Sequence, residues 1–215
     1  MSAVRQYERQ TATIYHHEDV YLQREIEALE KTEFVAGVLY PRWKMMAGGR
    51  LMHNIICSNI IRSLGNKLSG SKCKALTSDT RVYTDRTPAY LYPDVTVLCG
   101  KPELRKYHSL ANPTLLVEVT SPGSVDYDRT TKLVIYDAIS SVKEYMIVSH
   151  LAQEIMLFRR DASGRLAFVE IATTTLTLES VNCTLDLQEI YEDISFEAEN
   201  EEDEEENEEE ENDDN

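Results

Sequence analysis

The chain reads Tyr92-Pro93-Asp94-Val95-Thr96-Val97-Leu98 and, after a loop, Thr114-Leu115-Leu116-Val117-Glu118-Val119-Thr120-Ser121-Pro122. Both runs are apolar and rich in β-branched residues, and both end at turn residues, which is typical of buried strands. Each run carries one acid, Asp94 in the first and Glu118 in the second. A buried carboxylate without a partner costs several kcal/mol or is forced to keep its proton. We therefore expect a cation, either a metal ion or a lysine, beside Glu118.

The two acids suggest a reaction class if adjacent strands hold them on one side of a sheet. Two close carboxylates repel each other unless one keeps its proton or a divalent cation lies between them. Oxygen ligands without a nearby cysteine or histidine cluster favour Mg²⁺ or Mn²⁺. Such an ion can activate a water molecule and neutralise charge on a phosphate, and a lysine can assist it. The alternative for Asp94 is a turn-capping role at a strand edge.

The segment after the second run predicts a helix over residues 127–139, with Leu133, Tyr136 and Ile139 facing inward. Asp128 and Lys132 stand four residues apart, so they share one face of that helix. By itself the pair reads as a surface ion pair worth a few tenths of a kcal/mol. Lys132 therefore has two interpretations, a catalytic lysine or simply the partner of Asp128.

Two further helices follow from apolar periodicity. The clearest covers residues 51–68 and ends at Gly70, and His53 lies at the edge of its apolar face. We interpret this lone histidine as a packed or capping residue rather than a catalyst. A shorter helix near the start would face the core with Tyr21, Leu22, Ile26 and Leu29.

Charge divides the chain of 215 residues unevenly. The net charge is −16, yet residues 192–215 hold 16 of the 38 acidic residues and no lysine or arginine. The remaining 22 acidic residues balance the 22 lysines and arginines, so the rest is formally neutral. Such a tail cannot bury a core. We predict an N-terminal helical segment (1–32), one domain (33–191) and an acidic, disordered tail (192–215).

The cysteines predict no metal or disulfide framework. Cys57, Cys73, Cys99 and Cys183 are widely spaced, without a zinc-ligand pattern. We interpret Cys57 and Cys99 as small core residues, and a disulfide framework is not expected at this length and density. No apolar run approaches the roughly 18 residues of a membrane span, and the polar start is unlike a signal peptide. We expect a reduced, cytoplasmic protein without a membrane segment.

A longer pattern resembles a known family. It consists of Tyr92-Pro93-Asp94-Val95-x-Val97, then Val117-Glu118-Val119-x-Ser121-Pro122-x-Ser124-x-x-Tyr127-Asp128-Arg129-x-x-Lys132-x-x-x-Tyr136, and then Val142-Lys143-Glu144-Tyr145-Met146-Ile147-Val148. Glu33, Gly37, His53 and Ser78-Asp79-x-Arg81-Val82 extend it toward the start. The pattern, over roughly residues 33–190, resembles the Uma family, bacterial proteins of the PD-(D/E)XK (restriction-endonuclease-like) endonuclease superfamily.

The resemblance implies an α/β (α+β) fold, a mixed β-sheet core flanked by helices. It also implies that Asp94 and Glu118 are catalytic metal ligands for Mg²⁺ or Mn²⁺, with Glu33 as a further metal ligand. Thr120 stands where the superfamily usually has its lysine, so Lys132 becomes the candidate to reach the site from the helix. Asp79 is a weaker candidate for the surroundings of the site.

The chain also departs from the family pattern. It has Ala36-Gly37-Val38 where the family usually has Asp-Gly-Glu, and its acidic tail lies outside the pattern. Two functions from different classes follow. The first is a Mg²⁺-dependent DNA endonuclease, for which DNA is the substrate and a homodimer the simplest way to cut both strands. The second is an inactive nuclease-fold scaffold whose acidic tail binds a basic protein partner.

Overall fold

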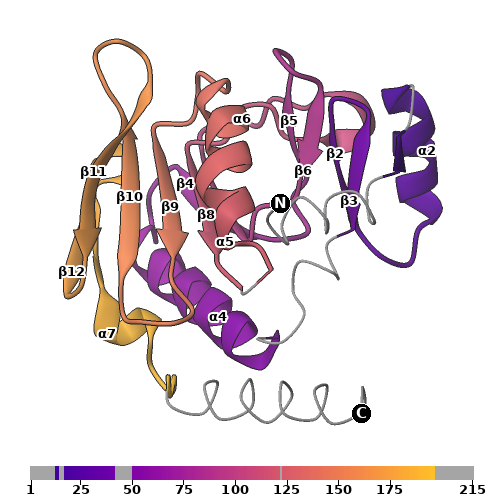
Figure 1. Cartoon of the computed structure of the whole chain (residues 1–215). Coiled ribbons are helices and arrows are strands. Elements are labelled where there is room, and N and C mark those ends of the chain that lie inside the picture. Colours follow the sequence, from indigo (N-terminus) through magenta and orange to yellow (C-terminus); the bar gives the residue numbers. More distant parts are fainter. Residues whose placement is uncertain (1–12, 15–16, 42–49, 122, 197–215) are drawn as a thin grey trace, which may run out of the picture.

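The centre of the molecule is a six-stranded sheet. The computed structural model describes residues 13–14, 17–41, 50–121 and 123–196 (Figure 1). The strand order is β11-β10-β9-β8-β7-β4. In chain order these strands are β4 (Cys73–Thr77), β7 (Val95–Cys99), β8 (Leu115–Val119), β9 (Glu144–Val148), β10 (Ile155–Arg160) and β11 (Leu166–Ala172). Both acid-bearing runs are therefore strands, as predicted, and they are neighbours.

One pair of strands in this sheet is parallel. β8 and β9 run in the same direction, and every other neighbouring pair is antiparallel. Parallel neighbours need a crossover, and here it consists of α5 (Val125–Tyr127), a π-helical turn η2 (Asp128–Lys132) and α6 (Leu133–Asp137). Figure 1 shows this helical segment in front of the sheet. The predicted helix over residues 127–139 is thus the crossover of a β-α-β unit.

A second, five-stranded sheet brings the N-terminal part of the chain beside the first. Its order is β1-β3-β2-β6-β5. The strands are β1 (Thr13–Ile14), β2 (Thr32–Val35), β3 (Val38–Pro41), β5 (Val82–Thr84) and β6 (Ala89–Leu91). In Figure 1 this sheet lies on the opposite side of α6 from β11. The short connection between β6 and β7 joins the two sheets, and Asp94 lies within it.

Helix α2 (Glu18–Glu27) packs on the five-stranded sheet with only half of the predicted apolar face. Tyr21 and Leu22 are fully buried, and the Tyr21 ring stacks on Phe34. Ile26 and Leu29 are exposed, and Leu29 lies beyond the end of the helix. The predicted inward orientation of these last two residues is therefore wrong. Leu29 lies past the end of the helix, and Ile26 lies in its last turn, beyond the buried residues Tyr21 and Leu22.

The two faces of the six-stranded sheet have separate cores. On one face, Ile56, Ile60 and Leu64 of α4 (Arg50–Lys67) are buried at four-residue steps, as the periodicity predicts. The same core includes β12 (Thr175–Leu178), β13 (Cys183–Asp186) and α7 (Leu187–Ile190). Short 3-10 turns lie at η1 (Lys106–His108) and η3 (Glu179–Val181). The crossover helix covers the other face.

Alternation along β8 decides which way Glu118 points. Leu115, Val117 and Val119 belong to the α4 core, whereas Leu116 packs with Tyr136 and Tyr145 on the crossover side. Since successive strand residues point to opposite faces, Glu118 faces the crossover helix. All five β8 residues are buried, so the charge of Glu118 is enclosed by protein.

The expectation of no disulfide is wrong. Cys73 on β4 and Cys99 on β7 are directly opposite each other in the antiparallel register and form a disulfide. Their separation of 26 residues gives no hint of this pairing, because only the strand register brings them together. Cys57 and Cys183 are half-buried and belong to no disulfide among the described residues. Among the described residues, no helix has the length and apolarity needed to cross a membrane.

Candidate active site

Asp94 and Glu118 come together through the pairing of β7 with β8. Val95 lies opposite Val117 in the antiparallel register, and continuing the register by one residue places Asp94 opposite Glu118. The backbone N–H of Val119 donates a hydrogen bond of 2.8 Å to Asp94 Oδ2. Asp94 is 4% exposed and Glu118 1%. The two sequence motifs thus form one buried pair of acids.

Lys132 reaches the acids from the crossover helix. Its Nζ atom lies 2.9 Å from Glu118 Oε2 and 2.9 Å from Asp128 Oδ1. Lys132 is 4% exposed and Asp128 1%. The π-helical turn that carries both residues is a rare local geometry, which often occurs at functional sites. The cation expected beside Glu118 is therefore this lysine in the described structure.

Glu33 brings a further carboxylate from the five-stranded sheet. It lies on β2 and is 0% exposed. Its Oε1 accepts a hydrogen bond of 3.1 Å from the backbone N–H of Tyr92 and lies 3.8 Å from Lys132 Nζ. Its Oε2 is buried and has no hydrogen-bond partner among the residues that the structure describes. A buried acceptor atom in this state can bind a water molecule or a cation.

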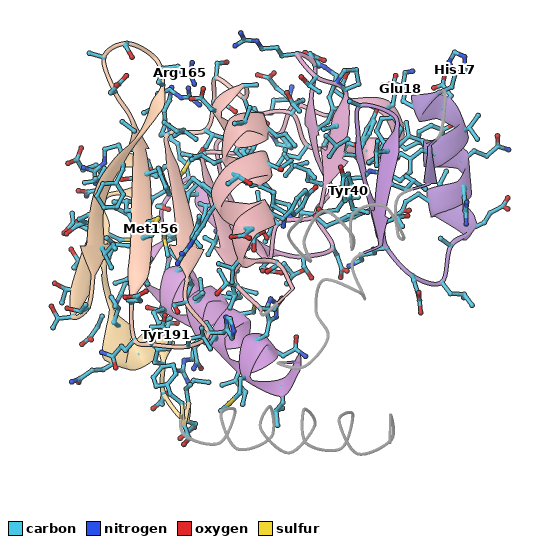
Figure 2. The ribbon with its side chains drawn as sticks, in the orientation of Figure 1. His17, Glu18, Tyr40, Met156, Arg165 and Tyr191 are labelled. Carbon is cyan, nitrogen blue, oxygen red and sulfur yellow. A yellow bond between two sulfur atoms is a disulfide. The ribbon has the colours of Figure 1, made fainter. Side chains whose placement is uncertain are left out.

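Tyrosines enclose the cluster. The Tyr136 hydroxyl donates a hydrogen bond of 2.5 Å to Glu118 Oε1, and the Tyr145 hydroxyl donates one of 3.0 Å to the backbone carbonyl of Asp128. The Lys132 ammonium lies 5.4 Å from the centre of the Tyr127 ring, which itself packs on Tyr40 of β3. Tyr40 is labelled in Figure 2. These aromatic contacts keep water away from the charged groups and so strengthen their interactions.

Burial shifts the pKa values of Glu118 and Asp128, the two acids that contact Lys132. It raises the pKa of Glu118 well above its ordinary value, Lys132 opposes this shift, and the nearby Asp94 increases it. Burial also raises the pKa of Asp128, again opposed by Lys132. The pKa of Tyr136 is raised by burial and by Glu118, so this phenol keeps its proton and remains a hydrogen-bond donor.

His53 adds a contact on the other side of Asp94. It is buried on α4, and its Nε2 lies 3.1 Å from Asp94 Oδ2. Its Nδ1 lies 3.6 Å from the sulfur of Cys57, one helical turn further on. His53 therefore links α4 to Asp94 in the connection between β6 and β7.

The charges of this cluster favour a divalent cation. Four carboxylates are buried here, from Glu33, Asp94, Glu118 and Asp128. Among the described residues, Lys132 is the only lysine or arginine that is buried. Such an excess of negative charge in a dry site is costly unless protons or a cation offset it. The donor set of carboxylate oxygens suits a hard divalent ion. The residues present therefore fit a metal site.

The comparisons with known proteins place the chain in a family. The sequence profile of the Uma2 family, described as "Putative restriction endonuclease", matches residues 18–195. The chain belongs to the Uma2 family. Two cyanobacterial relatives from Synechocystis sp. are described as uncharacterized proteins slr1290 and sll1609. The first is 30% identical over 82% of this chain and 91% of its own length, and the second 27% over 74% and 89%.

A solved structure shares the fold of this Uma2 protein. It is described as a putative nuclease belonging to DUF820 from Anabaena variabilis, and it superposes with a TM-score of 0.60 at 14% identity. The match covers 79% of this chain and 96% of the other. The predicted fold class, a restriction-endonuclease-like mixed sheet flanked by helices, is confirmed.

The structure brings together the residues that the Uma resemblance singled out. Glu33, Asp94, Glu118 and Lys132 all belong to the buried cluster. Asp79 does not, because its exposed side chain forms an ion pair with Lys31 on the surface. At the position of the usual superfamily lysine, the Thr120 hydroxyl lies 2.8 Å from His150 Nδ1 and donates to the Val148 carbonyl.

Sequence reasoning missed three groups in this Uma2 site. Asp128 was expected on the surface, and Tyr136 and His53 were expected to serve packing. The four-residue spacing of Asp128, Lys132 and Tyr136 puts all three on one helix face, and this was the available signal. No comparable signal links His53 to Asp94, because 41 residues separate them and only the fold brings them together.

Proposed function

We propose that this protein is an endonuclease that hydrolyses phosphodiester bonds in DNA with Mg²⁺ or Mn²⁺. One observation carries the proposal. Glu33, Asp94 and Glu118, from separate segments of the two sheets, converge with Lys132 in one buried cluster. A lysine that served only to neutralise a stray acid would need one carboxylate. Several carboxylates around one lysine are the equipment of a metal-dependent phosphodiesterase.

The acids would share the work of binding the ion. Asp94, Glu118 and Glu33 would hold it, and the partnerless Glu33 Oε2 is the most direct support for this assignment within the described residues. When bound, the cation would lower the pKa of a coordinated water and offset negative charge on the phosphate. Tyr136 and the Val119 backbone N–H are positioning groups, since they orient Glu118 and Asp94 without reaching the substrate.

Lys132 would act on the reacting groups themselves. In hydrolysis, a water molecule loses a proton and its oxygen forms a bond to phosphorus, while the bond from phosphorus to the leaving sugar oxygen breaks and the leaving oxygen takes up a proton. A fixed ammonium group beside the acids would orient the attacking water and stabilise the charge that develops on the phosphate. Asp128 holds the lysine at 2.9 Å, so it is a further positioning residue.

DNA binding would depend on a modest set of surface cations. Phosphate neutralisation supplies most nonspecific affinity for DNA. Exposed basic residues include Lys72, Lys74, Arg86, Lys101 and Arg105. Arg81 is instead bonded to Ser109 and the Tyr107 carbonyl, and Lys106 is paired with Glu18 and Asp19. With these two cations occupied, we expect weak DNA binding that is detected best at low salt.

The test is plasmid nicking at low salt with Mg²⁺, with Mn²⁺ and with EDTA. Wild-type protein should convert supercoiled plasmid to the open-circular form with either metal and not in EDTA. Asp94→Asn and Glu118→Gln should each abolish the reaction. Glu170→Gln, at an exposed position of β11 away from the cluster, is the matched control and should cut like wild type. A chain truncated after Phe196 tests whether the acidic tail restrains cutting.

Two results would argue against the proposal. Metal-independent cutting, or cutting that survives in both acid variants, would mean that the cluster is not the reaction centre. Failure of every form to cut single-stranded, double-stranded and supercoiled DNA, with folding verified by circular dichroism, would favour the scaffold function.

A further inference from the structure

We propose that His53, Cys57 and Asp94 form a second metal site, which takes a transition-metal ion such as Zn²⁺ or Co²⁺ rather than Mg²⁺. His53 and Cys57 approach Asp94 from α4, whereas the other members of the carboxylate cluster lie on the side of the crossover helix. No step of the proposed nuclease reaction uses His53 or Cys57. The site therefore stands on its own geometry and donor chemistry.

The geometry is close to that of a bound ion. One ring nitrogen of His53, the sulfur of Cys57 and one carboxylate oxygen of Asp94 all lie within 4.8 Å of one another. In tetrahedral zinc sites, bonds of about 2.0–2.3 Å place the ligand atoms roughly 3.3–3.8 Å apart. Small side-chain movements would bring the three atoms to these separations. In the structure the two ring nitrogens of His53 face different ligands, because Nδ1 lies 3.6 Å from the Cys57 sulfur and Nε2 lies 3.1 Å from Asp94 Oδ2. Binding of one ion by all three residues therefore requires the His53 ring or the Cys57 side chain to turn.

The backbone supports the three ligands from two directions. His53 and Cys57 are four residues apart on α4, so they lie one above the other on the same face. Ile56 and Ile60, fully buried in the core, fix that helix against the sheet. The Val119 N–H orients the Asp94 carboxylate through a bond of 2.8 Å. Outer contacts of this kind hold metal ligands in place in known sites.

The donor types select the metal. Mg²⁺ binds oxygen and rarely accepts sulfur, whereas thiolate and imidazole are preferred ligands of Zn²⁺ and related ions. One sulfur, one nitrogen and one oxygen also leave a fourth tetrahedral position for water or another small ligand. Two neighbouring sites thus share Asp94 and differ in the ion that they prefer.

The shared acid has a consequence for regulation, and this part rests on the proposed nuclease function. An ion held by His53 and Cys57 would draw on Asp94, which the carboxylate cluster needs for its own cation. Zn²⁺ at low concentration should therefore inhibit Mg²⁺-dependent cutting. Substitution of Cys57 should relieve this inhibition.

The first experiment is a Co²⁺ titration of the full chain followed by absorbance. A cysteine thiolate bound to Co²⁺ gives a charge-transfer band in the near ultraviolet that carboxylates, including those of the acidic tail, do not give. We expect this band in the wild type and in Cys183→Ser, the matched control at the other half-buried cysteine outside the disulfide. We expect no band in Cys57→Ser. Loss of an outer contact alone lowers metal affinity about ten- to hundredfold, so His53→Gln should weaken Co²⁺ binding at least tenfold.

A second measurement needs no substitution. Zn²⁺ should slow alkylation of Cys57 in the wild-type chain while leaving Cys183 in the same molecule unprotected, as read from the two peptides by mass spectrometry. If His53 only bridges Asp94 and Cys57 by hydrogen bonds and no metal binds, neither the charge-transfer band nor metal-dependent protection of Cys57 should be observed. Absence of the band in folded wild type, its persistence in Cys57→Ser, or equal alkylation with and without Zn²⁺ would each overturn the proposal.

The activity measurement separates this inference from the proposed function. If the chain cuts DNA, Zn²⁺ should inhibit the wild type and Cys183→Ser far more than Cys57→Ser. Equal inhibition of all three would refute the regulatory part. If the chain does not cut DNA, the spectroscopic and alkylation results still decide whether the metal site exists.

Discussion

Lys132 Nζ lies 2.9 Å from Glu118 Oε2, although the lysine belongs to a helix and the acid to a strand. In the superfamily that this chain resembles, the lysine usually follows the acid by two residues on the same strand. Here Thr120 occupies that position and bonds to the Val148 carbonyl instead. The crossover helix thus supplies the cation that the strand lacks.

Replacing Lys132 by methionine separates its two effects. Nuclease activity should fall by about a hundredfold or more, because a preorganised donor to the developing charge is lost. In EDTA the variant should also be destabilised by about 3–5 kcal/mol, since Glu118 and Asp128 lose their buried partner. Its affinity for Mn²⁺ should rise, because the site becomes more negative. The plasmid-nicking assay measures the activity, denaturant unfolding the stability, and titration calorimetry the affinity for Mn²⁺.

Lys143→Met is the control for that comparison. Lys143 is exposed, and its ammonium donates a hydrogen bond to the Ser140 carbonyl rather than to an acid of the cluster. This variant should match wild type in cutting, stability and Mn²⁺ affinity. Unchanged activity in Lys132→Met would exclude a catalytic role for the helix lysine.

Glu33→Gln tests the acid from the five-stranded sheet. Glutamine can still accept the hydrogen bond from the Tyr92 backbone N–H, so the fold should persist. The charge at the partnerless Oε2 is lost, and Mn²⁺ affinity should fall about tenfold or more. Isothermal titration with Mn²⁺ measures the change. Glu103→Gln, at an exposed position, is the control, and equal affinity in both variants would remove Glu33 from the site.

Tyr136→Phe removes one hydrogen bond and little else. The free energy of unfolding should decrease by about 1–3 kcal/mol, because a buried acceptor on Glu118 loses its donor. Activity should fall while KM for DNA stays unchanged, since the tyrosine orients Glu118 and does not reach the substrate. Tyr107→Phe, on an exposed ring, should change neither quantity. A larger KM would instead indicate a contact between Tyr136 and DNA.

The raised pKa of Glu118 predicts a pH-dependent stability in EDTA. An acid whose pKa is higher in the folded state makes the fold less stable as pH rises above the unfolded-state value of about 4.3. The Tm should therefore decrease through this range, and Glu118→Gln should remove part of that decrease. Thermal unfolding between about pH 4 and pH 8 measures the difference. Parallel curves for the two proteins would show that the carboxyl pKa is not raised.

Glu189 provides a control of opposite sign. Hydrogen bonds from Ser63 and Lys67 lower the pKa of this exposed acid. Such a group contributes stability above its unfolded-state pKa and loses it as pH falls through the folded-state value. Glu189→Gln should therefore lower the Tm slightly at neutral pH and leave it unchanged in acid.

The disulfide between Cys73 and Cys99 should contribute measurable stability. A cross-link that closes a separation of 26 residues stabilises by about 3.5 kcal/mol in the chain-entropy account. The double variant Cys73→Ser/Cys99→Ser should lose about this amount in urea unfolding. Wild type unfolded with a reductant should behave like the double variant, and identical curves with and without reductant would show that the cross-link contributes nothing.

Much of the fold and the cluster could be predicted from local pattern. The apolar runs around Asp94 and Glu118 predicted strands because burial on both faces leaves a continuous apolar signature. An acid inside such a run required a cation, and Lys132 provides it. The resemblance to the family then added Glu33, for which periodicity alone gave no reason.

The remaining features depend on tertiary contacts that no local pattern contains. The contact between His53 and Asp94 joins residues of different layers, and the Cys73–Cys99 disulfide depends on strand register. Asp128 was interpreted as a surface residue because the four-residue spacing is the same for exposed and buried ion pairs. Leu29 was expected to face the core because periodicity does not mark where α2 ends.

The crossover between β8 and β9 also carries the lysine, and this makes assembly of the acid–lysine cluster depend on chain folding. β8 holds Glu118, and the chain must leave β8, form the π-helical turn and return to β9 before Lys132 can meet that acid. Parallel pairing across such a connection is a slow step in folding. The nascent chain would thus present the acids before it presents the lysine, and the nuclease reaction that we propose would begin only when the β-α-β unit has closed.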